Sequence, residues 1–78
     1  MRDNVRDHIA RLVREEMDRQ GKRHRELAAV LGVDQSSTTL RINGRRSFRA
    51  EELVKVAAWL QVPVDRLLPS PTVSERAA

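Results

Sequence analysis

The sequence predicts an all-α fold in one small domain, and three observations support this prediction. Apolar residues recur every three to four positions along successive segments, which is the spacing of one helix face. Residues that end helices, such as Gly21, Gly32 and Pro69, separate those segments. The chain has 78 residues, enough for one core but not for a second folded unit. We therefore expect a domain at residues 1–68 and a flexible tail at residues 69–78.

Three helices are expected to supply most of the core. The first covers residues 4 to about 20, with Asn4 as a candidate N-cap. A later helix is expected at residues 50–60, and a short fifth helix at residues 64–68 begins after Pro63. The apolar stripes of these helices are Val5, Ile9, Leu12, Val13 and Met17, then Leu53, Val56, Ala57, Leu60 and Leu67.

The stretch HRELAAVLGVDQSSTTLRIN, residues 24–43, predicts two short helices joined by a tight turn. The apolar face of the first is Leu27, Ala28 and Leu31. Gly32 tolerates the positive φ of a helix stop, and Asp34 can cap a second helix at residues 35–42. That second helix opens with short hydrogen-bonding side chains that are poor helix formers. A helix that exposes such groups is suited to contact with the edges of DNA bases.

Basic residues gather around this two-helix unit. The net charge of +4 is modest, but residues 22–49 hold seven basic residues against two acidic ones, and the remainder holds eight against nine. Arginine outnumbers lysine by 13 to 2, and the guanidinium group is the better partner for phosphate and guanine. A solvated charged face is the simpler explanation for an average protein. Beside a polar helix, the charge favours a nucleic-acid surface.

The same stretch resembles the helix-turn-helix of the Cro and phage-repressor family, also called the xenobiotic-response-element family. The resemblance covers about residues 5–68 and is carried by ELAAVLGVDQSS, RINGRRSF and EELVKVAAWLQVPVDRLL. Ala28, Gly32 and Val33 match the turn signature of the family. The resemblance implies a compact five-helix lambda-repressor-like DNA-binding domain, in which helices 2 and 3 form the helix-turn-helix.

The resemblance also implies positions that contact bases. In the family, the first turn of helix 3 enters the major groove, so Gln35 and Ser36 inherit base-reading positions and Thr39 inherits a third. Glutamine suits a pair of hydrogen bonds with adenine, and a threonine methyl can pack on the thymine methyl. Leu40 has two interpretations, contact with a thymine methyl or simple packing.

The other inherited contacts are to phosphates. The candidates are Arg23, His24, Arg41, Asn43, Arg45, Arg46 and Arg49. Asn43 matches a phosphate-contacting position of the family, and in similar proteins the loop that follows it lies along the DNA backbone. A mobile solvated loop would explain the charges, but not their position beside the recognition helix.

Several positions depart from the family pattern. Arg23 and His24 stand where relatives carry a hydroxyl cap and a phosphate-binding glutamine. We expect packing to hold this helix start, and His24 to donate to a phosphate. Ser37 and Thr38 face inward with structural roles, Thr38 in place of an aliphatic residue. Arg41 also replaces an aliphatic residue, and we expect it to follow the domain edge and direct its guanidinium to a phosphate.

These features predict a sequence-specific double-stranded DNA-binding transcription regulator, most simply a Cro-like repressor that occludes a promoter. A domain this small needs two copies on adjacent half-sites for useful affinity. The candidate homodimer contacts are Trp59, Val64 and Leu68. The alternative is an antitoxin-type module that binds a toxin partner and autoregulates its operon. A tail of about ten residues is short for wrapping a partner.

Other classes of function lack support in the sequence. No nucleophile–base pair or phosphate loop indicates an enzyme, and no cofactor or small-molecule ligand is expected. His8 and His24 have no third ligand at metal-binding spacing. No apolar run approaches the roughly 20 residues that span a membrane. The absence of cysteine suits a reducing cytoplasm, where we expect the protein to associate with the nucleoid.

Overall fold

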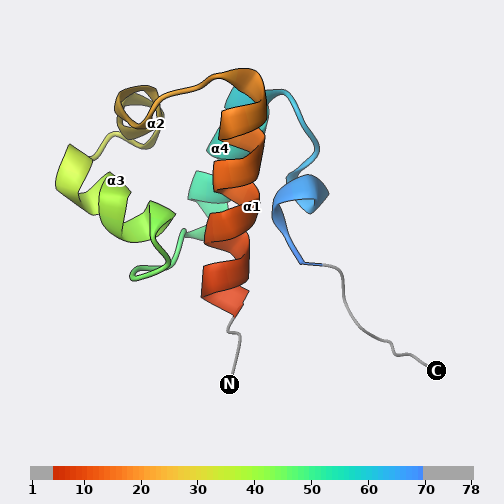
Figure 1. Cartoon of the computed structure of the whole chain (residues 1–78), viewed down its shortest axis with the longest axis horizontal. Helices are drawn as coiled ribbons and strands as arrows, with labels where there is room; N and C mark the ends of the chain where they lie inside the picture. Colours follow the sequence, from red (N-terminus) through yellow and green to blue (C-terminus); the bar gives the residue numbers. More distant parts are fainter. Residues whose placement is uncertain (1–4, 70–78) are drawn as a thin grey trace.

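The computed structural model describes residues 5–69, which form four α-helices and one turn of 3-10 helix (Figure 1). The elements are α1 (Val5–Gln20), α2 (His24–Leu31), α3 (Gln35–Ile42), α4 (Ala50–Leu60) and η1 (Val64–Leu67). The all-α prediction is confirmed, but the expected fifth helix is a single 3-10 turn. The candidate cap Asn4 and the tail residues 70–78 lie outside the described residues.

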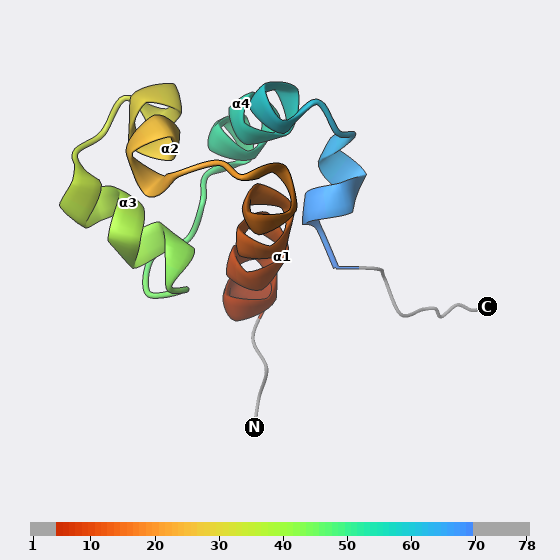
Figure 2. The same ribbon diagram turned by 45° about the horizontal axis from the view of Figure 1, so that its top comes forward.

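The helices surround one aliphatic core. In both views α1 runs between the α2–α3 pair on one side and η1 on the other, with α4 behind it in the first view (Figures 1 and 2). Every element contributes to the core, because an eight-residue amphipathic helix cannot bury its apolar face alone. The buried cluster is Val13, Met17, Leu27, Leu31, Ile42, Leu53, Val56, Ala57, Leu60 and Leu67.

Two helix starts are capped by glutamates rather than by the arginines that precede them. The Arg23 amide donates to Glu26 Oε1 at 2.8 Å, and the Arg49 amide donates to Glu52 Oε1 at 2.9 Å. A carboxylate in the third helical position satisfies a backbone amide that would otherwise lack a partner at the helix start. The expectation that packing alone holds the start of α2 was therefore wrong. The arginine side chains are not needed as caps.

The first helix also holds the C-terminal ends of two others. Arg14 Nη1 donates to the Ile42 carbonyl oxygen at 2.6 Å, and Gln20 Nε2 donates to the Leu60 carbonyl oxygen at 2.8 Å. These carbonyls end α3 and α4, where helical oxygens lack an amide partner within the helix. The guanidinium of Arg14 also complements the negative end of the α3 dipole. Side chains of α1 therefore set where α3 and α4 end against the core.

Gly44 brings the chain back against α1 directly after α3. Its φ is +78°, and a Cβ placed on it would overlap the Asp7 carboxylate and lie 3.3 Å from Asp7 Cα. Gly21 has a similar φ of +70°, but a Cβ there would have no neighbour within 4 Å. Both glycines therefore adopt a positive φ that other residues rarely adopt. Only at Gly44 would a side chain also clash with a neighbour.

We predict that Gly44→Ala destabilises the domain more than Gly21→Ala does. The left-handed backbone costs about 1–2 kcal/mol at either site. Overpacking against Asp7 adds about 1–3 kcal/mol at Gly44 only. Urea unfolding of both variants followed by circular dichroism measures the difference. Equal losses of unfolding free energy would show that α1 yields freely to the added methyl group.

Candidate nucleic-acid interface

The helix-turn-helix is formed by α2, a turn through Gly32 and Val33, and α3. Gly32 has φ +71° and ψ 30°, in the left-handed region, and its amide donates to the Ala28 carbonyl oxygen at 2.8 Å. The Val33 amide donates to the same oxygen at 3.2 Å. This pattern stops α2 and lets the chain reverse direction within three residues. The predicted turn and the predicted helix boundaries on both sides are confirmed.

Asp34 fixes the start of α3. Its Oδ1 accepts a hydrogen bond from the Ser37 amide at 2.8 Å. This backbone bond is the main reason why the pKa of Asp34 lies below its usual value, with a side-chain bond from Ser37 adding to it. The carboxylate therefore stays charged at the positive end of the α3 dipole. The predicted cap is confirmed.

Helix α3 has one outward polar face and one inward face. Gln35, Ser36 and Thr39 are exposed and Leu40 is half-buried. Thr38 is completely buried, and its Oγ1 donates to the Asp34 carbonyl oxygen at 3.0 Å. A buried hydroxyl that bonds to its own helix avoids the cost of an unsatisfied polar group. The inward placement of Thr38 is confirmed, and three of the four residues predicted to read bases are exposed, Leu40 being the exception.

Exposed basic side chains precede α2 and follow α3 in the chain. Arg23 and His24 are exposed at the start of α2, and Arg45, Arg46 and Arg49 are exposed between α3 and α4, together with Asn43. The amides of Arg45 and Arg46 donate to the Leu40 carbonyl oxygen at 2.8 and 3.2 Å. These bonds tie the backbone of the loop to the end of α3. The arginine side chains thus extend from a backbone that is held next to the outward face.

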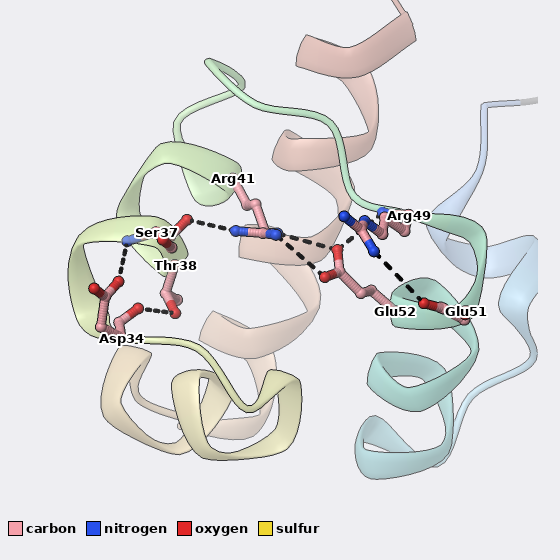
Figure 3. A network of polar contacts seen from close by, with 7 residues as sticks. All are labelled: Asp34, Ser37, Thr38, Arg41, Arg49, Glu51 and Glu52. Atoms are coloured by element: carbon pink, nitrogen blue, oxygen red, sulfur yellow. Dashed lines mark hydrogen bonds and ion pairs between the residues drawn. The ribbon is translucent and has the colours of Figure 1, made fainter.

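Arg41 does not lie where the sequence suggested. Its side chain is 7% exposed, and its guanidinium forms an ion pair with Glu52 of α4, with 3.0 Å between Nε and Oε1 (Figure 3). The expectation that Arg41 reaches a phosphate was therefore wrong, because all three guanidinium nitrogens are bonded inside the domain. Burial raises the pKa of Glu52. Hydrogen bonds from the Arg49 backbone and from Arg41 together lower it by more than burial raises it, so the net shift is downward.

The candidate dimer residues occupy one end of the molecule. Trp59 is half-buried against the core, and Lys22 Nζ lies 5.4 Å from the centre of its ring, within cation–π range. Val64 is half-buried, and Leu68 is 38% exposed. Part of the Trp59 surface is therefore covered by its own chain. The role of these residues as a homodimer contact stays a prediction.

Residues 5–69 contain neither a cluster of metal-ligating side chains nor a membrane-spanning helix. No group of three or more histidine, aspartate or glutamate side chains there could hold a metal ion. No helix in the same part of the chain has the length and apolar character needed to cross a membrane.

Comparison with known proteins agrees with this geometry. A hypothetical transcription factor, NHTF, from Neisseria has a TM-score of 0.75 at 26% identity, over 87% of this chain and 78% of that one. The clp gene regulator ClgR from C. glutamicum has a TM-score of 0.77 at 23% identity, over 85% of this chain and 86% of that one. The restriction-modification controller protein C.AhdI from Aeromonas hydrophila has a TM-score of 0.71 at 22% identity, over 80% of this chain and 94% of that one. No curated protein matches the chain.

The turn at Gly32, the outward face of α3 and these shared folds define the class, which is that of helix-turn-helix regulators of the Cro and phage-repressor type. The BetR domain matches residues 4–77. The chain belongs to the BetR domain family, a helix-turn-helix family.

Two residues that organise the site were missed from the sequence. Glu52 caps α4 and binds Arg41, and Arg14 binds the end of α3. The capping role of Glu52 has a local signal, a glutamate three residues after a helix start. The other two bonds join residues 11 and 28 positions apart, and no local pattern marks such pairs.

We predict that Asp34 makes stability depend on pH in the acidic range. Its folded pKa lies below the ordinary value of 3.8, so its contribution to stability is complete above that value and is lost as the pH falls through the folded pKa. Asp34→Asn keeps a capping side chain but removes this titration. The melting temperatures of wild type and Asp34→Asn, measured from pH 2 to 7, should diverge near neutral pH and converge in acid. A constant difference would contradict the assignment. Asp34→Ala should lower the melting temperature at every pH.

Proposed function

We propose that this protein is a sequence-specific double-stranded DNA-binding transcription regulator and acts as a Cro-like repressor. The observation that carries the proposal is the outward face of α3, where Gln35, Ser36 and Thr39 are exposed, with exposed arginines before α2 and between α3 and α4 in the chain. Three proteins that share the fold are described as a hypothetical transcription factor, a clp gene regulator and a restriction-modification controller protein. Membership of a helix-turn-helix family supports the same proposal.

In this proposal α3 enters the major groove. Gln35 pairs with an adenine edge, Ser36 and Thr39 contact neighbouring bases, and Leu40 packs on a thymine methyl. The phosphate contacts come from Arg23, His24, Asn43, Arg45, Arg46 and Arg49. Arg41 is no longer among them, because its guanidinium is buried. Base edges then supply specificity, and the arginines supply affinity that does not depend on sequence.

Two copies bind adjacent half-sites about one helical turn apart, since one small domain covers too little DNA for strong binding. Trp59, Val64 and Leu68 are the proposed contacts between the copies. The bound dimer covers a promoter element and excludes the polymerase. This role places the protein with the nucleoid in the cytoplasm.

Gln35→Ala tests the base-reading role. Duplexes selected from a random pool define the preferred site, and the variant should lose about 1–3 kcal/mol of binding free energy on that site. Its affinity for random duplex should stay close to that of wild type. Lys55→Ala, which truncates an exposed side chain of α4, is the control. Equal losses on selected and random duplexes would refute the role of Gln35, and a pool that yields no preferred site would refute the proposed function.

Arg45→Gln and Arg46→Gln test the phosphate contacts. Each should weaken selected and random duplexes by similar factors and reduce the slope of log affinity against log salt by about one. Arg11→Gln removes the same charge from an exposed position of α1 and serves as the control. Fluorescence anisotropy at several salt concentrations measures the slopes. Slopes as steep as that of wild type would remove these arginines from the interface.

A further inference from the structure

We propose that Arg41 and Glu52 are positioning residues for base reading, which hold α3 at the angle its outward face needs without touching DNA themselves. The inference rests on the proposed function, and it assigns sequence specificity to a buried ion pair behind the DNA-facing surface. It also gives a role to the one arginine of α3, whose position within the recognition helix had suggested a phosphate contact.

The pair joins α3 to the first turn of α4 (Figure 3). Arg41 Nε and Nη2 donate to the two oxygens of Glu52 at 3.0 and 3.2 Å. Arg41 Nη1 donates to the Ser37 carbonyl oxygen, one turn earlier in α3, at 3.1 Å. Glu52 Oε1 also accepts the Arg49 amide at the start of α4. The planar guanidinium and the planar carboxylate therefore fix both distance and orientation.

This joint spans a gap that the two backbones leave open. Within the described helices, every Cα of α3 lies more than 8 Å from every Cα of α4, whereas α3 approaches both α1 and α2 more closely. Side chains rather than closely packed backbones therefore connect α3 to α4, through the shared apolar core and the Arg41–Glu52 pair. The turn at Gly32 holds the start of α3, and Arg14 holds its end at Ile42. Thr38 and Ile42, buried on the inward side of α3, already limit its rotation, and the Arg41–Glu52 pair adds directional hydrogen bonds to α4.

Stability alone does not explain the pair. The two side chains are 7% and 9% exposed, and removing such charges from water costs about as much as their attraction returns. An apolar pair could fill the same space. What an apolar pair lacks is directional bonding. Paired hydrogen bonds to a base edge tolerate only small errors in position, so the angle of α3 affects specific binding most.

Glu52→Gln tests the proposal with a change of one atom, because the amide group cannot accept both guanidinium bonds. Affinity for the selected duplex should fall about tenfold, equivalent to one well-placed base contact. Affinity for random duplex and the salt slope should match those of wild type, since the exposed arginines are unchanged. Glu15→Gln removes the same charge from an exposed position of α1 and should bind as wild type does.

The double variant Arg41→Met/Glu52→Leu separates orientation from stability. A well-packed apolar pair can replace a buried ion pair without loss of stability, whereas loss of the Glu52 bond to the Arg49 amide weakens the start of α4. The melting temperature of the double variant checks that it still folds. It should keep wild-type affinity for random duplex and lose about tenfold on the selected duplex. Unchanged ratios of selected to random affinity in Glu52→Gln or in the folded double variant would overturn the positioning role. A wild-type protein with no preference between the duplexes would refute the proposed function itself, and the positioning role with it.

Discussion

The weakness of α3 as an isolated helix is the constraint on which the rest of the structure depends. It has eight residues, and serine and threonine account for half of them. Such a segment does not form a stable helix in water, because nucleation is costly and these side chains compete for backbone hydrogen bonds. Every turn of α3 is therefore supported from outside its exposed face. Asp34 caps its start, Thr38 and Ile42 are buried on its inward side, and Arg14 binds its end.

That support leaves the outward face free for another use. Gln35, Ser36 and Thr39 contribute little to the fold, since their side chains are exposed. Surface positions of this kind change at small cost to stability. Under the proposed function, such a domain can alter its base preference through α3 while its core stays the same. The same separation explains how one fold serves regulators that share only 22–26% identity with this chain.

Arginines in this protein have two distinct jobs, and the composition does not distinguish them. Arg14 and Arg41 hold α3 through hydrogen bonds within the domain. Arg45 and Arg46 are exposed and extend from a backbone tied to Leu40. The positive excess around the helix-turn-helix therefore overstates the charge available to a ligand, because the Arg41 charge is neutralised by Glu52. Only the exposed arginines raise the potential that a phosphate backbone would meet.

The sequence by itself determined the all-α class, the turn at Gly32, the Asp34 cap and the inward side of α3, because each follows from spacing or capping within a few neighbouring residues. Only the tertiary structure decided the partner of Arg41 and the 3-10 form of residues 64–67. Arginine at a helix position that faces a neighbour can snorkel to solvent or bind a buried carboxylate, and the choice depends on a residue eleven positions away. The geometry of the last turn likewise depends on how Leu67 reaches the core, where it is completely buried.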